Sequence, residues 1–169
     1  MIIKSKNLVL LSLGSNLGSP EMVLLKAIRQ LEEANILSCL KVSQWYKTEP
    51  VGNLDQPWFL NIGISGMTSL SPYALMKICK SIEYLAGRQV RMRWQERELD
   101  IDIILYSDNV INLPDITIPH PRMHERRFVL TPLNDIAPDA VHPIFQKTIS
   151  QLLDECTDQA EVRIYQGGM

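Results

Sequence analysis

The chain has 169 residues, the length of one domain, and a globule of this size buries about 70% of the surface that its unfolded chain exposes. Apolar residues make up 46% of the sequence and charged residues 21%, which excludes a disordered tail or a fibre. The net charge is −2, so the protein lacks an overall field for holding nucleic acid, and any anion site must be local.

Cysteine usage and hydropathy indicate where the protein works. Its 3 cysteines, Cys39, Cys79 and Cys156, are far apart and have neither metal-ligand nor redox spacing, which is typical of a reducing compartment. No apolar run approaches the roughly 18 to 20 residues that span a bilayer, and the N-terminus leads only into a short apolar stretch, residues 8–13. We therefore expect a single cytoplasmic domain over residues 1–169, with no targeting segment or membrane anchor.

Four segments are expected to form strands. Residues 8–13 are a nearly continuous apolar run, typical of a buried strand. Residues 37–46 and 60–67 are rich in strand formers and flank a polar, turn-forming loop, residues 47–57. Residues 99–106 give the strongest strand pattern of the second half.

Three helices are expected from their capping signals. Ser19-Pro20 and Ser71-Pro72 each place an N-cap residue before a proline suited to the first helical position. Gly87 is placed to end the second helix. Thr148 and Gln151 make a capping box at the start of the last one.

The order strand, helix, strand, strand, helix, strand predicts an α+β fold with a ferredoxin-like β-α-β-β-α-β core. This core has an antiparallel sheet with helices packed on it. Beyond it we expect a C-terminal extension that contains a turn-rich stretch, residues 107–121, a mixed segment around residues 128–130 and the last helix.

Residues 87–102 join a basic segment to a strand with paired acids. Asp100 and Asp102 alternate with apolar residues, so both lie on one face of the expected strand, about 6 to 7 Å apart along it. Two carboxylates at that spacing suit two magnesium ions about 3.5 to 4 Å apart, which take further ligands from water and phosphate. Guanidinium groups donate paired hydrogen bonds to phosphate oxygens. The arginines upstream are Arg88, Arg91, Arg93 and Arg97.

Several of these patterns also have an ordinary structural interpretation. The acidic pair could be the outward face of an edge strand beside a solvated basic loop. Residues 14–18 could present backbone amides to an anion, but they match neither a P-loop nor a dinucleotide-binding pattern and indicate a tight strand-to-helix turn. His120, His124 and His142 share no zinc-like partner set, and no activated nucleophile is recognisable.

Ordered sequence blocks run through most of the chain. They are residues 13–18 (LGSNLG), 46–52 (YKTEPVG), 55–61 (DQPWFLN), 93–94 (RW), 99–103 (LDIDI) and 119–130 (PHPRMHERRFVL), with Glu83, Gly87, Arg88 and Arg97 between them. Together these blocks resemble the 6-hydroxymethyl-7,8-dihydropterin pyrophosphokinase family of folate biosynthesis. That family moves a pyrophosphoryl group from ATP to a pterin alcohol.

The resemblance implies a magnesium and triphosphate site. Asp100 and Asp102 would hold two Mg²⁺ ions that bridge the phosphates of ATP. The residues that would contact the nucleotide are Glu83, Arg88, Arg91, Trp94, Arg97, Ile103, His120 and Arg126. The implied catalytic set is Arg88, Arg97, Asp100, Asp102 and His120.

The resemblance also implies a pterin site. The pterin would lie between Phe59 and Phe128, whose faces offer offset stacking to a flat heterocycle. The residues that would read its amide-and-amine edge are Thr48, Pro50, Val51 and Asn61. Without the family pattern, both phenylalanines fit ordinary core packing.

The sequence departs from the family in two places. Where the family commonly has Trp-Gly-Pro-Arg, this chain has Trp94-Gln95-Glu96-Arg97, which lacks the turn-shaping glycine and proline and adds a negative charge. A second arginine, usual two residues after the position of Arg88, is replaced by Val90, and Arg91 follows one residue later. Arg91 could substitute for it or point elsewhere.

We therefore expect a magnesium-dependent monomer that transfers pyrophosphate from ATP to 6-hydroxymethyl-7,8-dihydropterin, giving AMP and the pterin diphosphate. Its partners would be these small molecules, with no nucleic acid and no membrane. One alternative is a ferredoxin-like binding module for RNA or a partner protein, against which the acidic composition counts. Another is a catalytically impaired pseudoenzyme, altered at Gln95-Glu96.

Overall fold

The structure of the protein is a computed structural model that describes residues 6–33, 36–87 and 95–167. The strands of its main sheet are β1 (Asn7–Ser15), β2 (Ser38–Val42), β3 (Tyr46–Thr48), β4 (Phe59–Thr68), β5 (Asp100–Tyr106) and β10 (Val162–Ile164). Two small hairpins are β6 (Ile111–Leu113) with β7 (Ile116–Ile118), and β8 (Val141–His142) with β9 (Lys147–Thr148). The helices are α1 (Pro20–Glu33), α2 (Pro72–Leu85), α3 (Arg127–Ile136) and α4 (Ile149–Glu155), with a short 3-10 helix, η1 (Met123–Glu125).

The main sheet has six strands. They lie in the order β10-β3-β4-β1-β5, and β2 also pairs with β4. Every one of these pairings is antiparallel. The predicted α+β class, an antiparallel sheet with helices packed on it, is confirmed.

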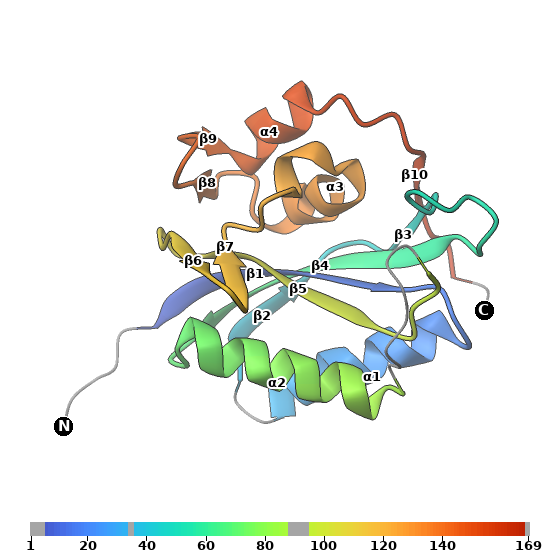
Figure 1. The fold of residues 1–169 in the computed structure, drawn as a ribbon, viewed down its shortest axis with the longest axis horizontal. Coiled ribbons are helices and arrows are strands. Elements are labelled where there is room, and N and C mark those ends of the chain that lie inside the picture. The colour runs from blue at the N-terminus through green and yellow to red at the C-terminus, as the bar shows by residue number, and fades with distance from the viewer. Residues whose placement is uncertain (1–5, 34–35, 88–94, 168–169) are drawn as a thin grey trace.

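The two faces of the sheet are covered by different helices (Figure 1). α1 and α2 lie on one face, where alternate residues such as Leu11, Ile62 and Ile101 build the larger core. α3 and α4 lie on the opposite face and pack over Leu10 and Ile104. Further along that second face the strand residues become polar, and the site forms there.

The capping signals correctly locate the helices. α1 begins at Pro20, and α2 begins after Ser71, whose Oγ accepts the backbone N–H of Ala74 at 3.2 Å. Gly87 follows the end of α2 with a φ of +89°, a conformation that glycine adopts without strain. The capping box at the start of α4 is also present. None of the described helices is long and apolar enough to cross a membrane.

The predicted single strand over residues 37–46 is wrong, because the structure has two strands there, β2 and β3. Between them, Ser43 donates its backbone N–H to the carbonyl oxygen of Gly63 at 2.9 Å, and side chains accept further backbone N–H groups. Gly63 donates its N–H to Ser43 Oγ at 2.8 Å, and Gln44 donates its N–H to Asp135 Oδ2 at 3.1 Å. Side-chain acceptors thus compete with regular pairing, and both strands still pair with β4.

The second half of the chain is more regular than its sequence indicates. Residues 128–130, expected to be mixed, lie inside α3, and the proline within this helix, Pro132, masks the helical pattern. The turn-rich stretch 107–121 contains the β6–β7 hairpin. Both differences arise where tertiary packing overrides local preference.

Candidate active site

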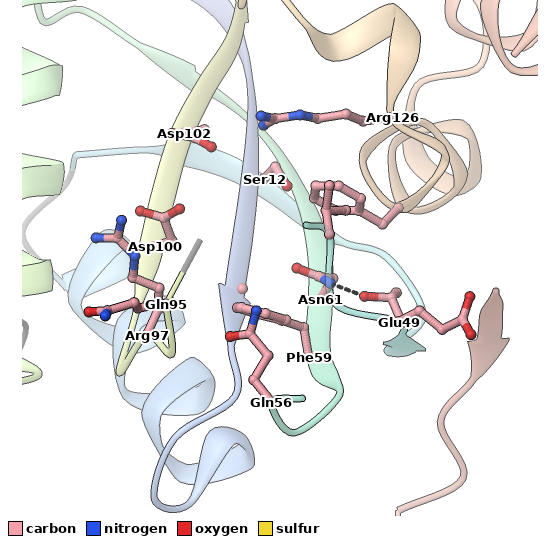
Figure 2. Close-up of a pocket in the computed structure, with 14 residues that line it drawn as sticks. Ser12, Glu49, Gln56, Phe59, Asn61, Gln95, Arg97, Asp100, Asp102 and Arg126 are labelled. Atoms are coloured by element: carbon pink, nitrogen blue, oxygen red, sulfur yellow. Dashed lines mark hydrogen bonds between the residues drawn. The ribbon is translucent and has the colours of Figure 1, made fainter. Parts of the chain in front are cut away.

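The candidate active site lies over three neighbouring strands. Gly14 of β1 is paired with Asn61 of β4 on one side and with Asp100 of β5 on the other. Ser12, two residues earlier, is paired with Asp102. Residues directly opposite in antiparallel strands point to the same face, so these five residues form one continuous surface, which we call the polar floor (Figure 2).

Gly14 provides the space that Asn61 occupies. A Cβ atom at position 14 would lie 2.4 Å from Asn61 Oδ1 and 3.8 Å from Cδ1 of Phe59. The first distance is well inside van der Waals contact, so any larger residue would displace the amide. The φ angle of Gly14 is not in the left-handed region, so its backbone conformation does not require glycine. Glycine is needed at this position because the Asn61 side chain approaches the backbone so closely.

A pocket of about 190 Å³ opens above the polar floor. In Figure 2, Asp100 and Asp102 stand on β5, Asn61 and Phe59 on β4, and Arg126 reaches over the floor toward Asp102 and Ser12. The lining residues are Ser12, Gly14, Thr48, Glu49, Val51, Gln56, Phe59, Asn61, Gln95, Arg97, Asp100, Asp102, Arg126 and Phe128.

One side of the pocket, the amide wall, consists of Thr48, Phe59 and Asn61 on β3 and β4. Asn61 is only 4% exposed, and its Nδ2 donates to Thr48 Oγ1 at 2.6 Å (Figure 2). This bond fixes the orientation of the amide and turns Oδ1 toward Gly14. Phe59 borders the amide, and Phe128 lines the same pocket from α3. Hydrogen-bonding groups beside aromatic faces suit a flat, polar heterocycle.

The other side, the carboxylate wall, consists of Asp100 and Asp102 on β5. Burial and the neighbouring charge of Asp100 raise the pKa of Asp102 to about 6, although Lys80 and Arg126 act in the opposite direction. A cation would relieve this excess of negative charge. No group of three or more His, Cys, Asp or Glu side chains among the described residues could hold a metal. A metal at this wall would therefore have two protein carboxylates and take its other ligands from water or substrate.

α2 supports the carboxylate wall from behind. Glu83 is 1% exposed, accepts the backbone N–H of Ile101 at 2.8 Å, and forms an ion pair with Lys80 at 3.1 Å. Ile101 lies between the two aspartates, so this bond fixes the backbone that carries both. The structure thus places Glu83 between α2 and β5 and outside the lining of the pocket.

A second pocket, of about 210 Å³, adjoins Asp102 and is lined by His120 and Ile103. Burial and the charge of Arg126 lower the pKa of His120 to about 4, so its imidazole is neutral at pH 7. Its Nδ1 accepts the backbone N–H of Arg122 at 3.2 Å. The single proton of the neutral ring therefore lies on Nε2.

Most of the predicted site residues that the structure describes converge on these pockets. The first pocket collects Thr48, Val51, Phe59, Asn61, Arg97, Asp100, Asp102, Arg126 and Phe128. Pro50 is buried between Glu49 and Val51, which line the first pocket. Arg88, Arg91 and Trp94 lie outside the described residues.

Sequence reasoning assigned Glu49 to the site only through the backbone of residues 48–51, and it did not assign four other lining residues. They are Ser12, Gly14, Gln56 and Gln95. Alternation along β1 could have found Ser12 and Gly14, because both lie on the face opposite Leu11 and Leu13. Gln56 and Gln95 lie in loops, where alternation does not indicate which way a side chain points.

The sequence is similar to proteins of one known family. Residues 10–138 match the family described as 7,8-dihydro-6-hydroxymethylpterin-pyrophosphokinase (HPPK). A Bacillus subtilis protein named 2-amino-4-hydroxy-6-hydroxymethyldihydropteridine pyrophosphokinase is 37% identical over 159 residues, which cover 94% of this chain and 90% of that protein. The Schizosaccharomyces pombe folic acid synthesis protein fol1 is 39% identical over 155 residues, 92% of this chain and 21% of that protein.

A solved structure also resembles the protein. The crystal structure of Plasmodium falciparum HPPK-DHPS A437G with STZ-DHP has a TM-score of 0.70 and 17% sequence identity, and the match covers 90% of this chain and 46% of that one. At this identity the likeness shows the fold alone. The family match and the Bacillus relative each extend over most of the sequence, and the chain therefore belongs to the 7,8-dihydro-6-hydroxymethylpterin-pyrophosphokinase (HPPK) family of enzymes.

Proposed function

We propose that the protein transfers pyrophosphate from ATP to 6-hydroxymethyl-7,8-dihydropterin, giving AMP and the pterin diphosphate, in folate biosynthesis. The observation that carries this proposal is the pairing of Gly14 with Asn61 on one side and Asp100 on the other, within one pocket. A neutral wall suited to a pterin and a charged wall suited to a metal-bound triphosphate then face the same space. A transfer between these two substrates needs both walls at once.

Magnesium fits the carboxylate wall by the chemistry of the donors. Asp100 and Asp102 supply hard oxygen ligands from one face of β5, and both line the first pocket. Two Mg²⁺ ions at this wall would keep several coordination positions for water and phosphate oxygens. Magnesium bound there with ATP would neutralise charge on the transferred group.

The protein's own side chains supply positioning and charge. Asn61 and Thr48 hold the edge of the pterin ring, and the phenylalanines hold its faces, so that the hydroxymethyl oxygen is directed at the β-phosphorus of ATP. Arg97 and Arg126 stabilise the negative charge that develops during transfer. His120, neutral and with its proton on Nε2, can donate a hydrogen bond to a phosphate oxygen without adding charge.

We infer that the sheet contains a ferredoxin-like core. The order β3-β4-β1-β5, with α1 after β1 and α2 between β4 and β5, supports this topology. On this interpretation, residues 1–169 are a single pterin pyrophosphokinase domain that acts in the cytoplasm as a monomer. ATP and the pterin are its partners, without nucleic acid or membrane.

AMP release from ATP with magnesium, measured with and without 6-hydroxymethyl-7,8-dihydropterin, tests this function. We expect AMP only when the pterin is present, with one pterin diphosphate formed for each AMP. Asp102→Asn should abolish this signal, and Asp154→Asn, a change at an exposed carboxylate on α4, should leave it unchanged. AMP release that does not depend on the pterin, or no release at all, would contradict the proposal.

Calorimetry with a non-hydrolysable ATP analogue tests the metal site separately. Wild-type protein should bind the analogue more tightly with magnesium than without it. Asp100→Ala and Asp102→Ala should lose this magnesium dependence. If both variants bind like the wild type, the assignment of metal to the carboxylate wall is wrong.

A further inference from the structure

The turn after β1 contains a buried amide, Asn16, which is 4% exposed. Its Oδ1 accepts the backbone N–H of Arg97 at 2.8 Å. Its Nδ2 donates to the carbonyl oxygen of Pro57 at 2.9 Å and to Gln56 Oε1 at 3.2 Å. Its backbone N–H also donates to the carbonyl oxygen of Arg97 at 3.1 Å. One residue is thus bonded to two segments that lie 40 or more positions away in the sequence.

These two segments belong to opposite sides of the pocket. Arg97 lines the pocket next to the carboxylate wall, and Gln56 lines it next to the amide wall. Gln56 Nε2 donates to the carbonyl oxygen of Asn53 at 2.9 Å. Gln56 therefore connects Asn16 to an earlier part of the loop that precedes β4. Phe59 begins β4 two residues after Pro57. Asn16 is not itself a lining residue, so it acts on the pocket through its partners.

Only an amide of this length can make these bonds together. The acceptor Oδ1 serves the Arg97 N–H, and the two N–H groups of Nδ2 serve two oxygens. In Asn16→Asp, the side chain can still accept the N–H of Arg97. An oxygen replaces Nδ2, however, so the two hydrogen bonds to Gln56 and Pro57 become repulsive contacts between oxygens. Alanine removes both kinds of bond. The two substitutions therefore separate the two sides of the pocket.

We propose that Asn16 is a positioning residue that holds the Arg97 segment and the Gln56–Pro57 segment at a fixed separation and thereby links the sites for the two substrates. The kinetic part of this inference rests on the proposed function. A loop held only at its own ends samples many conformations, and ordering it on binding weakens affinity. Because Asn16 already orders both segments, neither has to lose conformational entropy when a substrate binds.

Amide hydrogen exchange tests the connection independently of turnover. In Asn16→Ala, the Arg97 amide loses its acceptor and should exchange about 10-fold to 100-fold faster. In Asn16→Asp, the Arg97 amide should stay protected, because the carboxylate still accepts. The Ile101 amide, which is bonded to Glu83, is the internal reference and should not change in either variant. Unchanged Arg97 exchange in Asn16→Ala would overturn the proposal.

Steady-state kinetics test the consequence for the substrates. Asn16→Asp should raise KM for the pterin about 10-fold and leave KM for ATP within about 3-fold, because only the Gln56–Pro57 side is released. Asn16→Ala should raise both constants. Ser71→Ala is the matched control, since it removes the N-cap of α2 and weakens folding without changing any group of the pocket.

A purely structural role predicts a different pattern. Loss of folded protein lowers the measured rate in proportion to the active fraction but leaves both KM values unchanged, as expected for Ser71→Ala. That pattern in Asn16→Ala would overturn the positioning role. If the wild type shows no pterin-dependent turnover, the proposed function fails, and the exchange comparison still decides whether Asn16 holds Arg97.

Discussion

The amide wall and the carboxylate wall lie on the two neighbours of β1, but their polar groups are satisfied in different ways. On the amide wall, Asn61 is bonded to Thr48 within the protein, so this wall is complete before substrate arrives. On the carboxylate wall, Asp100 and Asp102 share one face, and burial together with the charge of Asp100 raises the pKa of Asp102 to about 6. The polar groups of the first wall are paired within the protein, whereas the second wall carries negative charge that the proposed magnesium would neutralise.

This contrast shows where the fold sacrifices stability for function. Two half-buried carboxylates on one face repel each other, and neutral residues there would favour folding. Glu83 and Lys80 hold the strand that carries them, so the charges stay in place in spite of their repulsion.

The largest expected effect comes from removing one charge of the carboxylate wall. Asp102→Asn should lower turnover at least about 100-fold, because a metal ligand is lost. It should also raise stability at pH 7 by about 1–3 kcal/mol in magnesium-free buffer, since the ionised form is disfavoured in the folded state. Turnover assays and urea denaturation measure the two changes. A variant that is both inactive and less stable would contradict the contrast between the walls.

The next largest effect is expected from filling the space beside the amide wall. Gly14→Ala places a methyl group against Asn61 Oδ1 and should raise KM for the pterin about 10-fold to 100-fold, with a smaller effect on KM for ATP. Gly66→Ala is the control, because its Cβ would also be crowded, at 3.0 Å from Leu37 Cβ, but outside the pocket. The control should lose stability and keep both KM values. Equal KM values in the two variants would show that the amide wall does not read the pterin.

A smaller effect concerns pH and the imidazole beside the carboxylate wall. His120 takes up a proton near pH 6.5 when unfolded but only near pH 4 when folded, so the unfolded state binds more protons between these values. Its contribution to stability is therefore complete above pH 6.5 and is lost as the pH falls through about 4, by about 1–3 kcal/mol. Asp102 has the opposite slope, because its folded pKa is raised.

Urea midpoints at pH 7 and pH 4.5 without metal check this prediction. His120→Gln should remove the histidine contribution, so that its stability falls less on acidification than that of the wild type. A fall equal to that of the wild type would show that His120 is not buried as a neutral ring.

The smallest effect is expected beside the amide wall, at Tyr46, which is paired with Asn61. The Tyr46 hydroxyl donates to Asp135 Oδ2 at 2.8 Å, and burial with this neighbour raises its pKa to about 12. Tyr46→Phe should cost about 1 kcal/mol of stability and leave both KM values unchanged. Chemical denaturation and kinetics of the same preparation measure this, and a change in KM for the pterin would extend the amide wall to Tyr46.

Sequence patterns predicted the carboxylate wall better than the amide wall. Strand alternation alone places Asp100 and Asp102 on one face, because a period of two leaves no other choice. Phe59 and Asn61 fit a buried strand equally well, and only the family resemblance assigned them to a site. Their use depends on the small residue at Gly14, a contact between strands that no local pattern contains.

Loops and long-range bonds set the remaining limits of prediction. The interruption between β2 and β3 depends on Asp135, more than 90 residues away from Gln44, and the role inferred for Asn16 depends on two distant segments. Such bonds follow from the complete fold. The start of a helix, in contrast, depends on two or three adjacent residues, and Ser71-Pro72 correctly predicted the start of α2.

The central place of β1 has one more consequence. Asn61 and Asp100 stand across Gly14 at two interstrand spacings, about 10 Å, a length set by backbone ladder bonds. Substitutions in the loops can change the affinity for each ligand, but they cannot change this distance between the two walls. On the proposed function, an acceptor whose reactive oxygen lies on a longer arm would place that oxygen beyond the phosphorus, so we expect the spacing of the strands to favour a short arm between ring and nucleophile.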